Sequence, residues 1–349
     1  MAPTGTSDNR RGCFKFGCFG CLGVVALLIG LPLILGLVGF LMGTPEPRQE
    51  QVQLSQPLPE APAAGGPLED PSTAPPLAPP GTAAPTDDLG SGDRRILDLG
   101  SATLAPPPAG TIRLDLGMGE FNVLPAAPGE GVRIEGDYDR ASFDLEEIFS
   151  QDSDGTWEYT IRFENKVSWI RWLWGNEQID NEITIFLPRD HPMAVVGEVD
   201  TGRSDLELGG LWLTEVDLQL GTGEHDLRFS EPIREPLERL KVDSGMGEIN
   251  LTGIGNASPA RASLEGSFGE FDVDLQGDWR GDSQIAIGFQ FGQCRVRLPE
   301  AARIDIQRSS MAFGERRLVL PEGQEELPET APTLALALEG SFGEMRIAP

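Results

Sequence analysis

A short pattern recurs through the C-terminal half of the chain and constrains what it can fold into. Each copy has an alternating apolar stretch, a glycine turn, an acidic or amide residue and a second alternating stretch, as in LKVDSGMGEINLTG and ASLEGSFGEFDVDL. The key glycines are Gly119, Gly223, Gly247, Gly269, Gly292, Gly314 and Gly343, and Ser204 takes the equivalent place in VDTGRSDLEL. From Gly223 the period is close to 22 residues, which is typical of a repeat architecture.

This period predicts an all-β fold. Alternate side chains of a strand face opposite sides, so a rung of two short strands and two turns cannot bury its own apolar face. Stacked rungs bury a continuous core, which predicts a parallel β-solenoid or β-roll with successive key glycines on one corner, about 5 Å apart. An antiparallel sandwich, in which each glycine turn closes a hairpin, is the alternative.

The N-terminal part of the sequence predicts a membrane anchor. Residues 20–42 are apolar and long enough for a transmembrane helix, and the nearby positive charges all precede them. We therefore expect a single-pass membrane protein with a cytoplasmic tail over residues 1–19 and an extracytoplasmic C-terminal domain. Three cysteines of the tail, Cys13, Cys18 and Cys21, could hold a metal with a partner's ligand, or could simply be thiols at the start of the helix.

Residues 43–92 are rich in proline and alanine and predict a disordered linker, extended over about 150 Å at most. Residues 93–349 form the predicted β-repeat domain, which residues 132–189 interrupt. Within this insertion, DSDGTW indicates a hairpin, and Leu145–Ser150 is the place where we expect a short helical turn.

The formal charge of −28 argues against a nucleic-acid partner, because an acidic surface repels phosphates. It is compatible with basic partners and with divalent cations. The sequence has two histidines, His191 and His225, far apart, and it shows no constellation of catalytic residues. We expect His225 and Cys294 to lie in the core, while Arg316 breaks the apolar pattern without an explanation.

One acidic column follows the key glycines: Glu120, Glu224, Glu248, Glu270, Gln293, Glu315 and Glu344. Stacked rungs would set these side chains about 4.8 Å apart, where carboxylates repel unless they are solvated or bridged. The sequence therefore offers two readings. Glu224, Glu248 and Glu270 could bind calcium, or the column could be a row of solvated turn residues with no cofactor at all.

A second candidate site is the aromatic stretch VSWIRWLWG. Trp169, Arg171, Trp172 and Trp174 could form a binding patch or a patch that touches the membrane. They could equally cap an open end of the solenoid, since unpaired strand edges need protection.

The strings VDTGRSDLELGGL, LQLGTGEHDLRF, LKVDSGMGEINLTGIG and LEGSFGEFDVDLQGDW resemble the bacterial toast-rack or “putative adhesin” β-strand-repeat domains. The resemblance covers roughly residues 110–349. It implies a domain of the bacterial cell envelope, and some relatives belong to systems that respond to cell-wall-active antibiotics. It supplies no catalytic residues.

Together these features predict a membrane-anchored, non-catalytic module for binding, adhesion, scaffolding or sensing, with an envelope protein or polysaccharide as its partner. One alternative is a solenoid enzyme that cleaves polysaccharide, which would need an acid/base group in a groove. Another is a lipid- or ligand-carrying module that uses the tryptophan-rich insertion.

Overall fold

A computed structural model of the chain describes residues 49–56, 110–153, 155–166 and 181–349. The predicted tail, the predicted transmembrane segment and most of the predicted linker lie outside these residues. So do the tryptophan patch and the three N-terminal cysteines. Among the helices that the structure describes, none has the length and apolar character needed to cross a bilayer.

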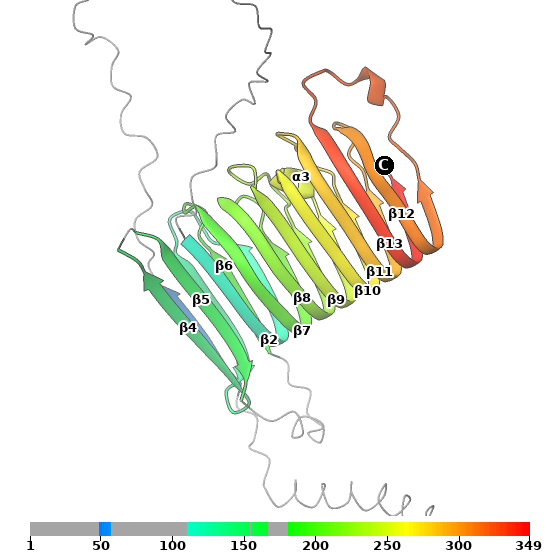
Figure 1. Cartoon of the computed structure of the whole chain (residues 1–349). Coiled ribbons are helices and arrows are strands. Elements are labelled where there is room, and N and C mark those ends of the chain that lie inside the picture. The colour runs from blue at the N-terminus through cyan, green and yellow to red at the C-terminus, as the bar shows by residue number, and fades with distance from the viewer. Residues whose placement is uncertain (1–48, 57–109, 154, 167–180) are drawn as a thin grey trace, which may run out of the picture.

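The described residues form one sheet that folds around a core (Figure 1). Its strands are β1 (Gln49–Gln56), β2 (Gly110–Pro125), β3 (Val132–Asp139), β4 (Phe143–Gln151), β5 (Trp157–Asn165), β6 (Glu182–Leu187), β7 (Met193–Glu207), β8 (Leu213–Arg228), β9 (Arg239–Thr252), β10 (Arg261–Asp274), β11 (Ser283–Arg297), β12 (Arg303–Leu318) and β13 (Thr333–Ala348). Two short helical turns, α3 (Ile254–Ala257) and η1 (Gln324–Glu326), lie in connections.

Parallel pairing of β7 to β13 confirms the stacked rungs and excludes the antiparallel sandwich for this part of the chain. Each rung is one long strand bent at its key glycine, where we had expected two short strands and two turns (Figure 1). Gly223, Gly247, Gly269 and Gly292 pair in succession, as predicted.

The assignment of Ser204 is wrong, because Gly202 pairs with both Gly119 and Gly223. The sequence reading took the apolar-polar spacing of VDTGRSDLEL one rung position too far. Ser204 lies two residues beyond the corner, beside His225, and its side chain is buried in the core.

The order of the last two rungs also differs from the sequence order. Strand β13 lies between β11 and β12, so Gly292 is followed by Gly343 and only then by Gly314. The apolar side chains of β13 are buried on both sides by its neighbours, whereas β12 is largely exposed at the edge of the sheet. Burial of the more apolar strand explains the exchange.

Aromatic side chains fill the other end of the stack. The rungs divide there, since one arm of β2 pairs with β5 and the other arm with β6. Phe163 packs against the rings of Phe121, Tyr138 and Phe143, with centroids 5.2–5.8 Å apart. All four side chains are buried, so this end of the core is closed.

The insertion contains the predicted hairpin, because β4 and β5 pair antiparallel around DSDGTW. The helical turn expected at Leu145–Ser150 is wrong, since these residues belong to β4. Their side chains alternate between half-buried and exposed, which suits a strand paired on one side.

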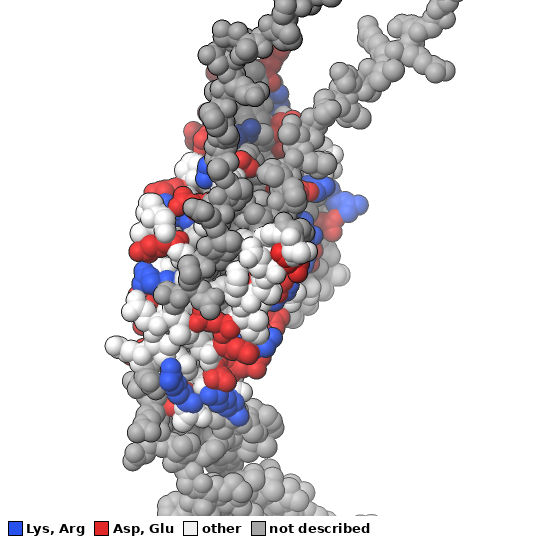
Figure 2. Space-filling view, turned by 90° about the vertical axis from the view of Figure 1, so that its left-hand side faces the viewer, with Lys and Arg blue, Asp and Glu red and all other residues white. Residues whose placement is uncertain are grey.

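Residues Gln49–Gln56 are also a strand, although they fall inside the predicted linker. This strand, β1, pairs antiparallel with β3 along its whole length. Val52 and Leu54 pack against the core, so a strand with two apolar side chains covers the edge of β3. Seen from this end of the molecule, acidic and basic side chains are interspersed over the visible face (Figure 2).

Candidate binding surface

The corner of the stack is built by glycines that no other residue can replace. Gly247 and Gly269 have φ angles of 139° and 120°, which side chains disfavour. A Cβ atom on Gly269 would lie 2.0 Å from the carbonyl oxygen of Gly247, and one on Gly247 would lie 1.8 Å from that of Gly223. The stacked glycines therefore let the strands bend at one place, and the residues on either side of the bend are exposed.

The residue before each of the last five glycines is apolar and exposed. These five side chains, which we call the corner ridge, are Met246, Phe268, Phe291, Phe342 and Phe313. The phenylalanine rings stack at centroid distances of 4.9 Å with interplanar angles of 1–8°. Exposure ranges from 41% for Phe291 to 64% for Phe313. Because neighbouring rings cover each other's faces, the edges of the inner rings point to solvent.

The sequence analysis missed the corner ridge, although a signal was present. An aromatic residue or methionine precedes the glycine in MGE, FGE, FGQ, FGE and FGE. Attention to the acidic residue after the glycine hid this second column. The two columns lie on either side of the same bend.

The acidic column lies beside the corner ridge. Glu224, Glu248 and Glu270 are neighbours on consecutive strands, as the repeat predicted. The column continues through Gln293 to Glu344 and ends at Glu315. Within the described residues, no three His, Cys, Asp or Glu side chains are grouped to hold a metal ion. Calcium at these glutamates stays a prediction.

A second row of carboxylates follows the other side of the corner ridge. Asp243, Glu265 and Glu339 stand four residues before the key glycines of β9, β10 and β13. Asp243 pairs with Lys241 at 2.6 Å, and Glu339 pairs with Arg308. The corner ridge therefore runs between two rows of acidic side chains.

Seven carboxylates flank the ridge on β9 to β13, and three of them have ion pairs. Besides Asp243 and Glu339, Glu270 lies 3.3 Å from Arg295. The other four make no ion pair with any residue that the structure describes; they are Glu248, Glu265, Glu344 and Glu315. The rows contain no lysine or arginine at these positions, so the surface beside the ridge is negative.

Both predicted core residues are buried, as expected. Burial raises the pKa of Cys294 to about 12, which keeps it a thiol at neutral pH. Burial also lowers the pKa of His225, whose Nδ1 shares a hydrogen bond of 2.8 Å with the Ser204 hydroxyl. Neither side chain reaches the surface where a substrate could meet it.

The structure explains Arg316. Its position pairs with the buried Met345, but β12 is the last strand of the sheet and has no neighbour on its other side among the described strands. The guanidinium donates hydrogen bonds to the backbone oxygen and the hydroxyl of Ser309. Ser309 likewise pairs with a buried residue, Leu338. Two polar residues therefore bond to each other at the two interior positions of the end rung.

Grooves that might hold a substrate offer little acid/base chemistry. In the groove beyond the corner, Asp272 and Asp274 form ion pairs with Arg295 at 2.9 Å and Arg297 at 3.0 Å. Burial raises the pKa of Glu147, which accepts a hydrogen bond from the Tyr159 hydroxyl, but no second carboxylate bonds to this pair among the described residues.

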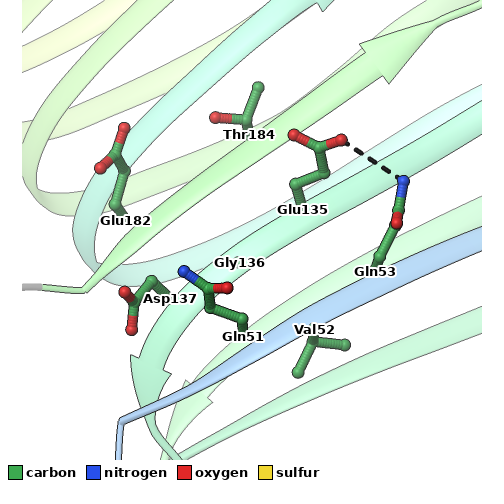
Figure 3. A pocket seen from close by; sticks show the side chains of 8 residues that line it. All are labelled: Gln51, Val52, Gln53, Glu135, Gly136, Asp137, Glu182 and Thr184. Atoms are coloured by element: carbon green, nitrogen blue, oxygen red, sulfur yellow. Dashed lines mark hydrogen bonds between the residues drawn. The ribbon is translucent and has the colours of Figure 1, made fainter.

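A shallow hollow lies on the outer face of β1, β3 and β6 (Figure 3). Its rows follow the strand register: Gln51, Asp137 and Glu182 form one, and Gln53, Glu135 and Thr184 form the other. Gln53 donates a hydrogen bond of 3.5 Å to Glu135. The hollow is polar and open, and it presents no set of groups with a defined reaction geometry.

The fold and the corner surface define an all-β repeat domain of stacked, glycine-cornered rungs. Residues 108–252 match the family described as the N-terminal domain of toast_rack, DUF2154. This part of the chain is a toast-rack domain, and the predicted resemblance is confirmed. No curated protein matches the chain.

Solved structures with similar strands carry adhesion descriptions. One is described as a putative cell adhesion protein from Clostridium sporogenes, with 16% identity over 68% of this chain and 92% of that chain and a TM-score of 0.35. Another is described as a putative adhesin from Bacteroides fragilis, with 13% identity over 67% and 91% of the two chains and a TM-score of 0.29. At these scores nothing about their binding is transferred to this chain.

Proposed function

We propose that the chain is a membrane-anchored, extracytoplasmic, non-catalytic binding module that uses its corner ridge to hold a partner in the cell envelope. The observation that supports this most is the row of five exposed apolar side chains on consecutive strands. If each leaves on the order of 80 Å² exposed, the ridge offers roughly 400 Å² of apolar surface. Patches of this size on soluble domains are commonly interaction sites.

The corner ridge suits binding because it is ordered before a partner arrives. Its rings are held at 4.9 Å by strands whose spacing the glycine corner fixes. Little conformational entropy remains to be lost when these side chains are covered. Enzyme activity has less support, since the carboxylates of the groove are held in ion pairs with arginines.

The anchor that we propose is the apolar segment at residues 20–42. Strand β1 begins at Gln49, so the six residues 43–48 would separate it from that segment. Six extended residues reach about 20 Å. With this anchor, the β1 end of the stack would stay close to the membrane, in place of the distant position that a free linker over residues 43–92 would allow.

Protease protection tests the topology. Protease added to intact spheroplasts is expected to digest the repeat domain and to spare the first residues of the chain. A repeat domain that is protected in spheroplasts and digested only after lysis would refute the extracytoplasmic assignment.

Site-specific photocrosslinking tests the binding role. A photoreactive phenylalanine analogue at position 291 of the full chain is expected to form adducts in the cells that make the protein. The control carries the same analogue at Ile148, which is exposed to a similar degree on β4, far from the corner. Adducts that form equally at both positions, or at neither, would contradict a role for the ridge in binding.

A further inference from the structure

We propose that the partner of the corner ridge is a cationic amphipathic α-helix, which lies along the ridge with its apolar stripe on the rings and its basic residues over the two acidic rows. This inference rests on the proposed binding function and names the chemistry of its partner.

Charge is the first argument. Seven carboxylates flank the five apolar residues, and neither row contains a lysine or arginine on β9 to β13. Four of the seven have no ion pair within the described part of the chain. A partner that covers the ridge also brings its own charges near these carboxylates. Basic side chains would gain electrostatic complementarity, and acidic ones would be repelled.

Spacing is the second argument. The rings repeat at 4.9 Å along the stack. Apolar residues on one face of an α-helix recur once per turn, at a pitch of about 5.4 Å, so its side chains can settle between successive rings. An extended strand places same-face residues about 6.8 Å apart and fits this row less well.

Length gives a size for the partner. Three ring spacings of 4.9 Å separate Phe268 and Phe313 by about 15 Å, and Met246 extends the ridge to about 20 Å. A helix that rises 1.5 Å per residue covers this length with about 13 residues. The partner segment therefore needs at least about four helical turns, with lysine or arginine on both sides of its apolar stripe.

Other occupants fit less well. A second copy that packed ridge against ridge would bring two sets of acidic rows together. An anionic membrane surface would be repelled for the same reason. A sugar ring stacks on the flat face of an aromatic side chain, and here the faces of Phe291 and Phe342 are covered by neighbouring rings.

The test uses the full 349-residue chain in a nonionic detergent and three synthetic 18-residue peptides labelled with a fluorophore. The first peptide has a leucine stripe flanked by lysines on a helix. The second has glutamate in place of every lysine. The third has the composition of the first in an order that breaks the stripe. Anisotropy titrations at low and high salt give the Kd values, with empty micelles as the blank.

The expected result is that the lysine peptide binds tightest, and that high salt weakens its binding. The double variant Phe291→Ser/Phe342→Ser is expected to raise its Kd by about tenfold or more, because truncating two central contacts commonly costs more than 1.4 kcal/mol. The control variant Ile148→Ser, on the exposed side of β4, is expected to leave the Kd unchanged. Circular dichroism of each variant checks that the strands remain folded.

Three outcomes would overturn the inference: equal affinity for the lysine and glutamate peptides, equal affinity for the scrambled peptide, or binding that ignores the ridge substitutions. The membrane alternative is tested by repeating the titration with the chain in phosphatidylcholine nanodiscs. Loss of peptide binding there, relative to detergent, would identify lipid as the occupant. If all peptides fail while crosslinks still form at position 291, the binding function stands and this partner chemistry is wrong.

Discussion

Substitution of a corner glycine tests the reasoning on which the rest of the surface depends. In Gly269→Ala, the new Cβ atom would lie 2.0 Å from the carbonyl oxygen of Gly247 in the preceding rung. Atoms of this kind are essentially never closer than 3.0 Å, so the two strands must separate by about 1 Å at the corner. Adjacent strands are only about 4.8 Å apart, and such a displacement breaks hydrogen bonds between them.

The magnitude follows from two contributions. The φ angle of 120° strains an alanine by about 1–3 kcal/mol. Loss of one or two inter-strand hydrogen bonds adds roughly 1–2 kcal/mol. We therefore expect Gly269→Ala to lower the free energy of unfolding by about 3–5 kcal/mol, a large part of the total for a domain.

Urea denaturation of the full chain, followed by circular dichroism, measures this loss. The matched control is Gly288→Ala on β11, where the added Cβ would meet only the Glu265 Cγ atom, at 3.9 Å. There we expect a change within about 0.5 kcal/mol, or a small gain. A loss below about 1 kcal/mol for Gly269→Ala, or an equal loss for both variants, would refute the close-approach argument.

Four further predictions concern charged and titratable groups. Replacement of the inward charge at the sheet edge, Arg316→Val, is expected to promote self-association in sedimentation velocity, whereas the outward Arg317→Val is not; equal behaviour would deny Arg316 its protective role. Because burial lowers the pKa of His225, stability should fall as pH drops below about 6.5 through the folded pKa, and His225→Phe should flatten a pH series of urea midpoints; an unchanged slope would contradict this. Burial raises the pKa of Glu147, so the folded state favours its protonated form and loses that contribution as pH rises; Glu147→Gln should raise the urea midpoint at pH 7 more than at pH 4, and the reverse order would be wrong. If the acidic column binds calcium, millimolar calcium should raise the melting temperature more than NaCl of equal ionic strength, and Glu248→Gln should abolish the difference; equal melting temperatures would leave a solvated column.

The stacked rungs could be predicted because their cause is local. Alternation of apolar residues and the recurrent glycine are both visible within about 22 residues, and together they require bent strands that share a core. Ser204 was misplaced since one irregular rung shifts the alternation by two residues without changing which side chains face inward.

The order of the last rungs depended on a comparison between two strands. β12 carries Ser309 and Arg316 at interior positions, where β13 has Leu338 and Met345. The longer step of 29 residues between Gly314 and Gly343 supplies the chain needed to return and insert β13. Both signals were in the sequence, but they become meaningful only when the edge of the sheet is considered as a place that suits polar residues.

The corner ridge was missed for a geometric reason. In a straight strand, the residues before and after a glycine share one face, and alternation gives no reason to treat them differently. The bend at Gly269 exposes Phe268 and Glu270 together, so an apolar row and an acidic row stand side by side. The backbone conformation of the glycine, which alternation alone does not define, therefore decides what the surface offers a partner.

Strand β1 shows how an edge elsewhere in the fold can select a local structure. QEQVQLSQ has two apolar residues and lies among prolines, so its composition favours a linker. The unpaired edge of β3 offers it backbone hydrogen bonds, and Val52 and Leu54 have the alternation needed to pack on the core. A segment with no strong preference of its own thus becomes a strand because it completes the sheet. If residues 20–42 span the membrane, this pairing also determines how near the stack lies to it, since only residues 43–48 remain between them.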